Sequence, residues 1–405
     1  MLPKSRTTSI RKTILRLARS EVHRTIRKEK KTSDAKGFAS DVFPKEAMRQ
    51  IWNFSAGPAM LPHEVLEEVQ SEFLDYHGLS YSIVETSHRT PEVEAIVASL
   101  TDRLRRLLRI PDDFEILYTQ GGGRTQFAMI PANLLQGKTG AYLVTGAWSE
   151  SALEEAERFG TAVAAARTCG KRLPEDDEIV LPADPAYLYY CDNETIHGVE
   201  FQKPPLSSRL DLNVPLVADA SSNFLSHPID WSRHVLVWAA AQKNFAPAGL
   251  TVVAVRRDAL GHLAPHMPSM FDYALYAERE SMPNTPPVFQ LYVAERVAGW
   301  VEKEGGVEEM DRRACVRSAL LYDALDARPD LYETRVAKTS RSRMNVAFFL
   351  RDESLMPAFV EAGRRAGFVH FTGHSSVGGL RVSLYNAMPI EGAERFADFL
   401  RAWRP

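Results

Sequence analysis

The sequence contains little cysteine, and its cysteines are far apart. Cys169, Cys191 and Cys315 form no Cys-x-x-Cys pair and no plausible disulfide framework. Because disulfides belong to oxidising compartments, this usage favours a reducing one, and we expect a cytoplasmic protein. The eleven histidines include no His-Glu-x-x-His motif and no paired metal-ligand spacing, so we expect no metal site.

Long apolar segments and a strong net charge are also missing. No apolar run approaches the length that crosses a membrane. The net charge of −3 over 405 residues creates no general attraction to nucleic acid. We therefore expect neither a membrane nor nucleic acid among the partners. A hydrophobic content of 45% and a charged content of 25% are typical of a globular protein, and the length suffices for two domains.

The N-terminal segment departs from this even charge distribution. Residues 1–40 hold 12 Lys and Arg but only three acidic residues. Such a composition predicts that residues 1–46 form a basic, disordered arm. An Arg-rich, acid-poor start is also typical of an organellar transit peptide, and the sequence leaves both interpretations open.

The main candidate for a functional residue is a lysine that lies between two apolar runs. Val235–Val255 reads V-L-V-W-A-A-A-Q-K-N-F-A-P-A-G-L-T-V-V-A-V, which predicts two buried strands around a turn that carries Lys243. Taken alone, such a lysine is more often one whose charged end reaches solvent. The alternative is a Schiff-base lysine, whose amine must be desolvated and lowered in pKa.

A second buried strand supports that alternative. Val214–Ser222 reads V-P-L-V-A-D-A-S-S and leaves the carboxylate of Asp219 near the strand end, where it needs a cation. Pyridoxal phosphate (PLP) satisfies both groups, because its aldehyde takes the lysine and its protonated ring nitrogen takes the aspartate.

Other candidate groups also follow predicted strands. A strand, a triple glycine and a helix start around Gly123 form the layout of a phosphate cradle, although glycines also make plain turns. Trp148 offers a stacking face, and Thr195 is a hydroxyl at a strand end. Ligands of open α/β sheets bind outside the carboxyl ends of the strands. We therefore expect one edge of the sheet to gather Gly123, Trp148, Thr195, Asp219 and Lys243.

The alternation of strands, loops and helices predicts an α/β fold with a mainly parallel sheet. A helical pattern at 288–303 stops at Gly305-Gly306, a plausible domain boundary. We expect a large domain at 63–305 and a smaller α+β domain formed by 47–62 and 306–405. His88-Arg89 is either ordinary surface or an anion clamp. Asn284-Thr285 lies among prolines, which predicts a stiff, exposed loop.

Taken together, nine ordered segments closely resemble the motifs of the phosphoserine aminotransferase family, within the class V aminotransferases. The resemblance covers roughly residues 51–405. The segments are N-F-S-A-G-P-A-M-L-P, S-H-R, Q-G-G-G-R-T-Q-F, C-D-N-E-T-I-H-G, D-A-S-S, A-A-Q-K-N-F-A-P-A-G-L, N-T-P-P-V-F, R-S-R-M-N-V and Y-N-A-M-P.

This resemblance implies a fold type I PLP enzyme that works as a homodimer with shared active sites. The implied reaction moves an amino group from glutamate to 3-phosphohydroxypyruvate in serine biosynthesis. The 4-phosphohydroxythreonine step of vitamin B6 synthesis is a further implied use. Lys243 and Asp219 would be the catalytic residues. The residues implied to bind the cofactor are Gly123, Arg124, Trp148, Thr195, Asp219, Gln242, Lys243, Asn284 and Thr285, of which Asn284 and Thr285 would reach it from the other subunit. Those implied to bind substrate are His88, Arg89, Arg124, His374 and Arg381.

One position departs from the family pattern and keeps an alternative open. Where the family has an arginine for the substrate phosphate, this chain has Ser375. The alternative is a sister aminotransferase that acts on a different acidic amino acid. A non-catalytic regulator is disfavoured by the intact pair of Lys243 and Asp219. A desulfurase is disfavoured because no cysteine lies in a flexible Gly/Ser-rich loop.

Overall fold

The structure is a computed structural model that describes residues 51–209 and 212–405. The expected basic arm at 1–46 lies outside the described residues. Trp52–Pro405 forms one compact unit.

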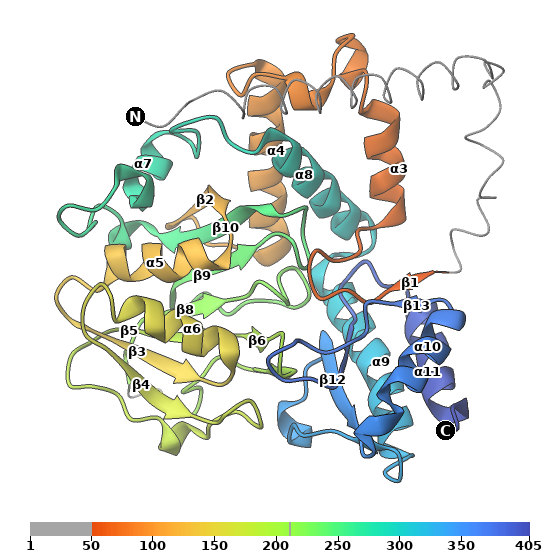
Figure 1. The fold of residues 1–405 in the computed structure, drawn as a ribbon. Helices are drawn as coiled ribbons and strands as arrows, with labels where there is room; N and C mark the ends of the chain where they lie inside the picture. The colour runs from red at the N-terminus through yellow and green to blue at the C-terminus, as the bar shows by residue number, and fades with distance from the viewer. Residues whose placement is uncertain (1–50, 210–211) are drawn as a thin grey trace, which may run out of the picture. The chain divides into compact units, whose positions relative to one another are not determined.

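A seven-stranded sheet is the frame of this unit (Figure 1). Its strands in spatial order are β2 (Phe114–Gly121), β10 (Gly249–Arg256), β9 (His234–Ala240), β8 (Leu216–Asp219), β5 (Pro185–Cys191), β3 (Thr139–Val144) and β4 (Ala162–Arg167). Only β10 runs against its neighbours, so the prediction of a mainly parallel α/β sheet is confirmed. β9 and β10 are joined by residues 241–248 alone, a connection too short for a parallel crossover.

Helices cover both faces of this sheet (Figure 1). One face packs against α4 (Pro91–Leu108) and α8 (Val288–Lys303), with α3 (His63–Glu72) beside α8. The other face packs against α5 (Gly123–Leu134), α6 (Ala147–Ala156) and α7 (Tyr273–Glu278). Because side chains alternate along a strand, each strand feeds both cores. In β2, Ile116 and Tyr118 enter the first core and Leu117 the second.

The C-terminal part builds a smaller layer around a third apolar core. Its sheet is antiparallel in the order β11 (Tyr332–Glu333), β12 (Asn345–Leu350) and β14 (Leu380–Ser383). Its helices are α9 (Gly306–Asp326), α10 (Met356–Arg365) and α11 (Ile390–Ala402). β1 (Trp52–Asn53) pairs in parallel with β13 (Phe368–Val369). This pairing supports the division into 63–305 against 47–62 with 306–405, which stays a prediction.

Other expected features concern membranes, metals and disulfides. Among residues 51–209 and 212–405, no helix is both long and apolar enough to cross a membrane. Within the same ranges, no three His, Cys, Asp or Glu side chains gather as a metal site would require. All three cysteines are free.

Candidate active site

The candidate groups converge at the carboxyl ends of the parallel strands. β9 ends just before the turn with Lys243, β8 ends at Asp219, and β5 leads into the short strand β6 (Asn193–Glu194), which Thr195 follows. β3 leads into α6 with Trp148, and β2 leads into α5 with Gly123. Since these five strands point the same way, their ends meet at one edge of the sheet.

Lys243 lies in contact with two of these groups. Its Nζ donates a hydrogen bond of 2.6 Å to Thr195 Oγ1 and lies 5.3 Å from the centroid of the Trp148 ring. Burial lowers the pKa of the Lys243 amine below the usual 10.5, while the negative charge of Asp219 acts in the opposite direction. A lysine with a lowered pKa carries a larger fraction of neutral, nucleophilic amine.

Asp219 is a buried carboxylate with few partners. It is 7% exposed, and its Oδ1 accepts hydrogen bonds from the Ser221 backbone N–H at 2.9 Å and the Ser221 hydroxyl at 2.6 Å. Burial raises the pKa of Asp219, and the positive charge of Lys243 and the bonds from Ser221 lower it. Within residues 51–209 and 212–405, the one hydrogen-bond donor to its Oδ2 is the Cys191 thiol, at 3.8 Å. A cationic ring N–H would be a strong donor to such an oxygen.

Trp148 is held in place by a buried glutamate. Glu194 is fully buried and accepts hydrogen bonds from the backbone N–H groups of Trp148 at 3.1 Å and Ser149 at 2.9 Å. The Ser149 hydroxyl donates a third bond at 2.5 Å. This carboxylate therefore neutralises the first turn of α6, where helix N–H groups favour an anion. The Trp148 indole Nε1 is buried and has no partner among the described residues.

The glycine-rich end of β2 has the form expected of a phosphate cradle. Gly121 has φ +102°, and α5 starts at Gly123, directly after the strand. No described atom lies within 4 Å of the place that a Cβ on Gly122 would take, so the loop has free space on that side. The unpaired N–H groups of a helix start favour an anion such as a phosphate. Arg124 follows and is exposed.

The remaining residues expected at the cofactor lie near the same edge. Gln242 precedes Lys243, and its carbonyl accepts a bond of 2.9 Å from the Ala59 N–H. The side chain of Gln120, near the end of β2, donates to Asn284 Oδ1 at 2.8 Å and to the Thr285 carbonyl at 2.6 Å. Asn284 and Thr285 are both exposed, as the proline-rich segment predicts.

The expected substrate residues fall into two groups. Arg381 joins the cluster, because its Nη1 donates 3.2 Å to the Thr195 carbonyl from β14. His374 is exposed in the loop before β14, with Ser375 beside it. His88 and Arg89 lie in the turn before α4. Among the described residues, no hydrogen bond or ion pair joins their side chains to the cluster around Lys243.

Two residues that hold this site in place were not singled out from the sequence. Ser221 is signalled by the spacing Asp-x-Ser, which is typical of a carboxylate that accepts from the backbone two residues on. Glu194 has no such signal, because its partners on α6 lie far away in the sequence. Both fix the groups that would touch a ligand.

The arrangement fits PLP. It offers an amine, a buried carboxylate that lacks a strong donor, an indole face and a glycine turn at a helix start. An orphaned Arg381 Nε adds an unused donor to the same region.

Comparisons with known proteins support this assignment. A curated phosphoserine aminotransferase of Aromatoleum aromaticum is 46% identical over 362 residues, which cover 87% of this chain and 98% of that protein. One from Acidithiobacillus ferrooxidans is 48% identical over 357 residues, covering 87% and 97%. The solved phosphoserine aminotransferase of Bacillus circulans subsp. alkalophilus has a TM-score of 0.82 and 42% identity, covering 87% and 98%. A PLP-bound phosphoserine aminotransferase from Trichomonas vaginalis also has a TM-score of 0.82, with 38% identity, covering 87% of this chain and 99% of that one.

These similarities confirm the fold type I architecture and PLP as the cofactor. The family model described as aminotransferase class-V matches residues 51–396. Because that match spans nearly the whole described chain, the protein belongs to the aminotransferase class-V family.

Proposed function

We propose that this chain transfers an amino group from glutamate to 3-phosphohydroxypyruvate, giving phosphoserine and 2-oxoglutarate. The observation that carries the proposal is the convergence of Lys243, Asp219 and Trp148 at one sheet edge. The relatives named phosphoserine aminotransferase favour this reaction over that of a sister enzyme for another acidic amino acid. The 4-phosphohydroxythreonine step and a cytoplasmic location stay predictions.

We assign the cofactor contacts as follows. Lys243 would hold the cofactor through its amine, Asp219 would pair with the protonated ring nitrogen, Trp148 would stack on the ring and Thr195 would bond the ring hydroxyl. Gly123, Arg124 and Gln242 would hold the cofactor phosphate, and Asn284 and Thr285 would reach it from the other subunit. Bound in this way, PLP supplies an electron sink for the bond broken at the substrate Cα.

The chain's own groups then carry the proton. With the cofactor bound, Lys243 would act as a neutral amine, which its lowered pKa favours. Its Nζ would be the base that takes the proton of the substrate Cα. Thr195 Oγ1, 2.6 Å from Nζ, orients the amine. Arg381 is assigned to the substrate carboxylate, and His88, Arg89, Arg124 and His374 to the distal anion.

A panel of keto acids tests the proposed reaction. With glutamate as donor, we expect the highest kcat/KM for 3-phosphohydroxypyruvate, measured by a coupled assay of 2-oxoglutarate release. Unphosphorylated keto acids of similar length should have a lower kcat/KM, because their distal group carries less charge than a phosphate. A higher kcat/KM for any of them would contradict the proposal.

We further propose a homodimer with shared active sites. Five large hydrophobic side chains lie exposed within a short segment of α3 and the turns after it: Leu66, Phe73, Leu74, Tyr81 and Val84. Clustered apolar exposure of this kind marks a surface that another chain covers. His88 and Arg89 follow this segment in the sequence. Among the described residues, their side chains form no hydrogen bond or ion pair with the groups around Lys243 of the same chain. They could therefore bind substrate in the active site of the partner subunit.

Mixed subunits test the shared sites. Chains with Lys243→Ala and chains with Asn284→Ala and Thr285→Ala are each expected to be nearly inactive. If each site draws on both chains, a mixed dimer has one site free of substitutions, and up to half of the wild-type activity per mixed dimer should return. Subunit exchange is verified by mass spectrometry with one chain isotope-labelled. Verified exchange without any recovery would count against shared sites.

A further inference from the structure

A cavity of about 120 Å³ lies on the face of the sheet opposite to the side chain of Asp219. Ala218 and Ala220 line this cavity, and because side chains alternate along a strand, Asp219 between them points to the other face. The cavity therefore lies directly behind the candidate active site. Its walls include the charged or titratable side chains of Tyr190, Asp192, Lys203, His227, Asp230 and His234.

Both ring nitrogens of His227 face hydrogen-bond acceptors. Nδ1 lies 2.8 Å from the Pro228 carbonyl oxygen, and Nε2 lies 3.1 Å from Asp192 Oδ2. Neither a carbonyl nor an ionised carboxylate can donate, so each nitrogen needs a proton to form its bond. The side chain of His227 is 18% exposed and that of Asp192 is 11% exposed, so water can replace little of this contact. The geometry is that of a charged imidazolium.

His234, in the same cavity, has partners of a different kind. Its Nδ1 lies 2.5 Å from the Asp230 carbonyl oxygen, and its Nε2 lies 2.8 Å from the Tyr190 hydroxyl. The carbonyl requires a proton on Nδ1, whereas the hydroxyl can donate to an Nε2 that carries none. A neutral ring therefore satisfies both contacts of His234.

The surrounding charges agree with this difference between the two histidines. Burial alone would lower the pKa of His227, but the hydrogen bond and the charge of Asp192 raise it above the usual 6.5. Glu200 also raises this pKa and Arg343 lowers it; these two residues pair with each other, with Arg343 Nη2 donating 2.8 Å to Glu200 Oε1. For His234, burial prevails and the pKa falls below 6.5.

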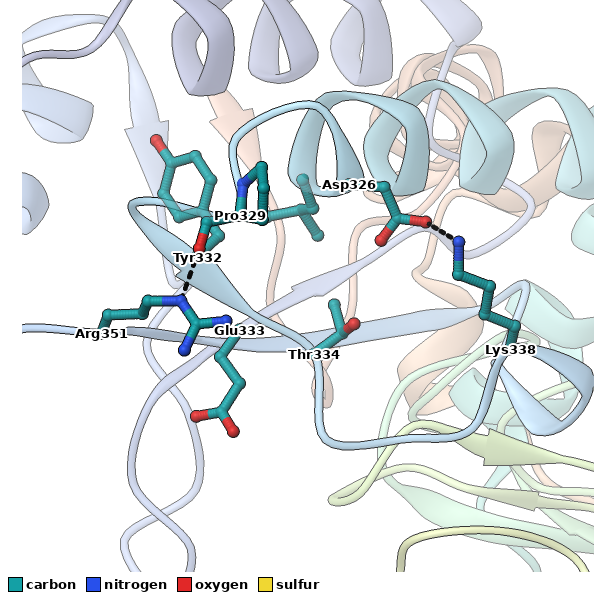
Figure 2. Close-up of a pocket in the computed structure, with 8 residues that line it drawn as sticks. Asp326, Pro329, Tyr332, Glu333, Thr334, Lys338 and Arg351 are labelled. Atoms are coloured by element: carbon teal, nitrogen blue, oxygen red, sulfur yellow. Dashed lines mark hydrogen bonds and ion pairs between the residues drawn. The ribbon is translucent and has the colours of Figure 1, made fainter.

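The cavity beside the end of α9 shows, by contrast, a charged pair that does not titrate near neutral pH (Figure 2). It encloses about 290 Å³, and in it Lys338 Nζ lies 2.9 Å from Asp326 Oδ2. No histidine is among its described walls. Lysine and aspartate both stay charged between about pH 5 and 9, whereas a histidine loses its charge within that range. The pair of His227 and Asp192 can therefore respond to pH.

Asp192 connects His227 with the active site. Its backbone N–H donates a bond of 3.0 Å to the Asp219 carbonyl, and its Oδ2 accepts a bond of 2.8 Å from Asn223 Nδ2, in the turn that follows Asp219. Asp192 also shortly precedes Thr195, whose hydroxyl bonds Lys243. Asp192 thus ties together the two segments that carry Asp219 and Thr195.

We propose that His227 is a positioning residue whose proton holds the segments of Asp219 and Thr195 in the arrangement that catalysis needs. With the proton present, Nε2 and the Asn223 amide both donate to Asp192. Asn223 Nδ2 also lies 3.1 Å from Nε2. Without the proton, Nε2 accepts from Asn223 and turns a lone pair toward the Asp192 carboxylate, which weakens both bonds to that carboxylate. The inference rests on the proposed transamination, but not on the choice of keto acid.

The test compares His227→Gln and His227→Arg with wild type in the glutamate half-reaction of the holoenzyme, from about pH 6 to 9. Near pH 6 wild type should react roughly tenfold faster than His227→Gln, a loss typical of small displacements in an active site. This ratio should fall toward 1 as the pH rises and His227 loses its proton. His227→Arg keeps its charge, and the adjacent cavity has room for the longer side chain, so its rate should not show this fall.

A ratio of wild type to His227→Gln that is the same at every pH would show a packing role only and overturn the inference. Adding Asp192→Asn to His227→Gln should cost little more than one substitution alone, because both act through the same bond. Full additivity of the two losses would also overturn it. The control His262→Gln replaces an exposed histidine that follows β10, and its ratio to wild type should stay near 1 throughout.

A measurement of ring protonation is independent of activity. In NMR spectra of protein with isotope-labelled histidine, assigned by single substitutions, His227 should keep both ring protons above pH 6.5 while His234 stays neutral. A neutral His227 at pH 6.5 overturns the inference even if the enzyme reacts with glutamate as proposed. Wild type that does not react with glutamate contradicts the proposed function, and the inference falls with it whatever the spectra show.

Discussion

Lys243→Ala is expected to lower transamination by about 10⁴-fold or more, because it removes both the group that bonds the cofactor and the base beside the substrate Cα. Lys243→Arg should lose as much activity, since it keeps a positive charge but cannot form the Schiff base. The comparison separates chemistry from charge. Single-turnover measurement of the glutamate half-reaction reports the loss without interference from product release.

The same variants should remain folded. Burial lowers the pKa of Lys243, so its charged form is unfavourable in the folded state, and its removal costs little stability. Borohydride treatment of wild type should leave the reduced cofactor on the peptide that contains Lys243, as read by mass spectrometry. A Lys243→Ala protein with more than about 1% of wild-type activity would remove this residue from the mechanism.

Asp219→Asn should separate activity from stability. Without the carboxylate the cofactor ring nitrogen loses its charged partner. Loss of one member of a buried pair costs about 3–5 kcal/mol, or roughly 10²- to 5 × 10³-fold in the rate of the half-reaction. Ser221 can still donate to the asparagine oxygen, so the local geometry is kept.

Although Asp219→Asn lowers activity, it should not lower the stability of the cofactor-free protein. The folded-state pKa of Asp219 is raised, so wild type loses stability as the pH rises from the usual 3.8 through that raised value. Asp219→Asn removes this penalty, and near neutral pH it should unfold at an equal or higher temperature than wild type. Without Asp219 the pKa of Lys243 should fall further. A lower unfolding temperature at neutral pH, together with unchanged activity, would contradict both assignments.

The positions of Lys243 and Asp219 near strand ends explain why these two residues could be predicted from the sequence. Lys243 and Asp219 each stand just after a run of buried residues, and a charged group there has few reasons to exist without a partner. The antiparallel direction of β10 could also have been predicted, because residues 241–248 are too few for a crossover helix.

The outer parts of the site were not readable in this way. Glu194 reaches α6 only after the chain has folded. His88 and Arg89 illustrate the converse. Their motif is clear in the sequence, yet one chain does not join them to Lys243. Contacts between distant segments or between subunits leave no local pattern of burial or spacing.

The pairing of β1 with β13 sets an order on the synthesis of the chain. Trp52 and Phe368 are in register, yet they are roughly 300 positions apart. At about 5–20 residues per second, β1 waits roughly 15–60 s on the ribosome for its partner strand. The large sheet, with Asp219 and Lys243, leaves the ribosome during that interval. Arg381, on β14, emerges after β13, so the nascent chain acquires Asp219 and Lys243 before the residue assigned to the substrate carboxylate.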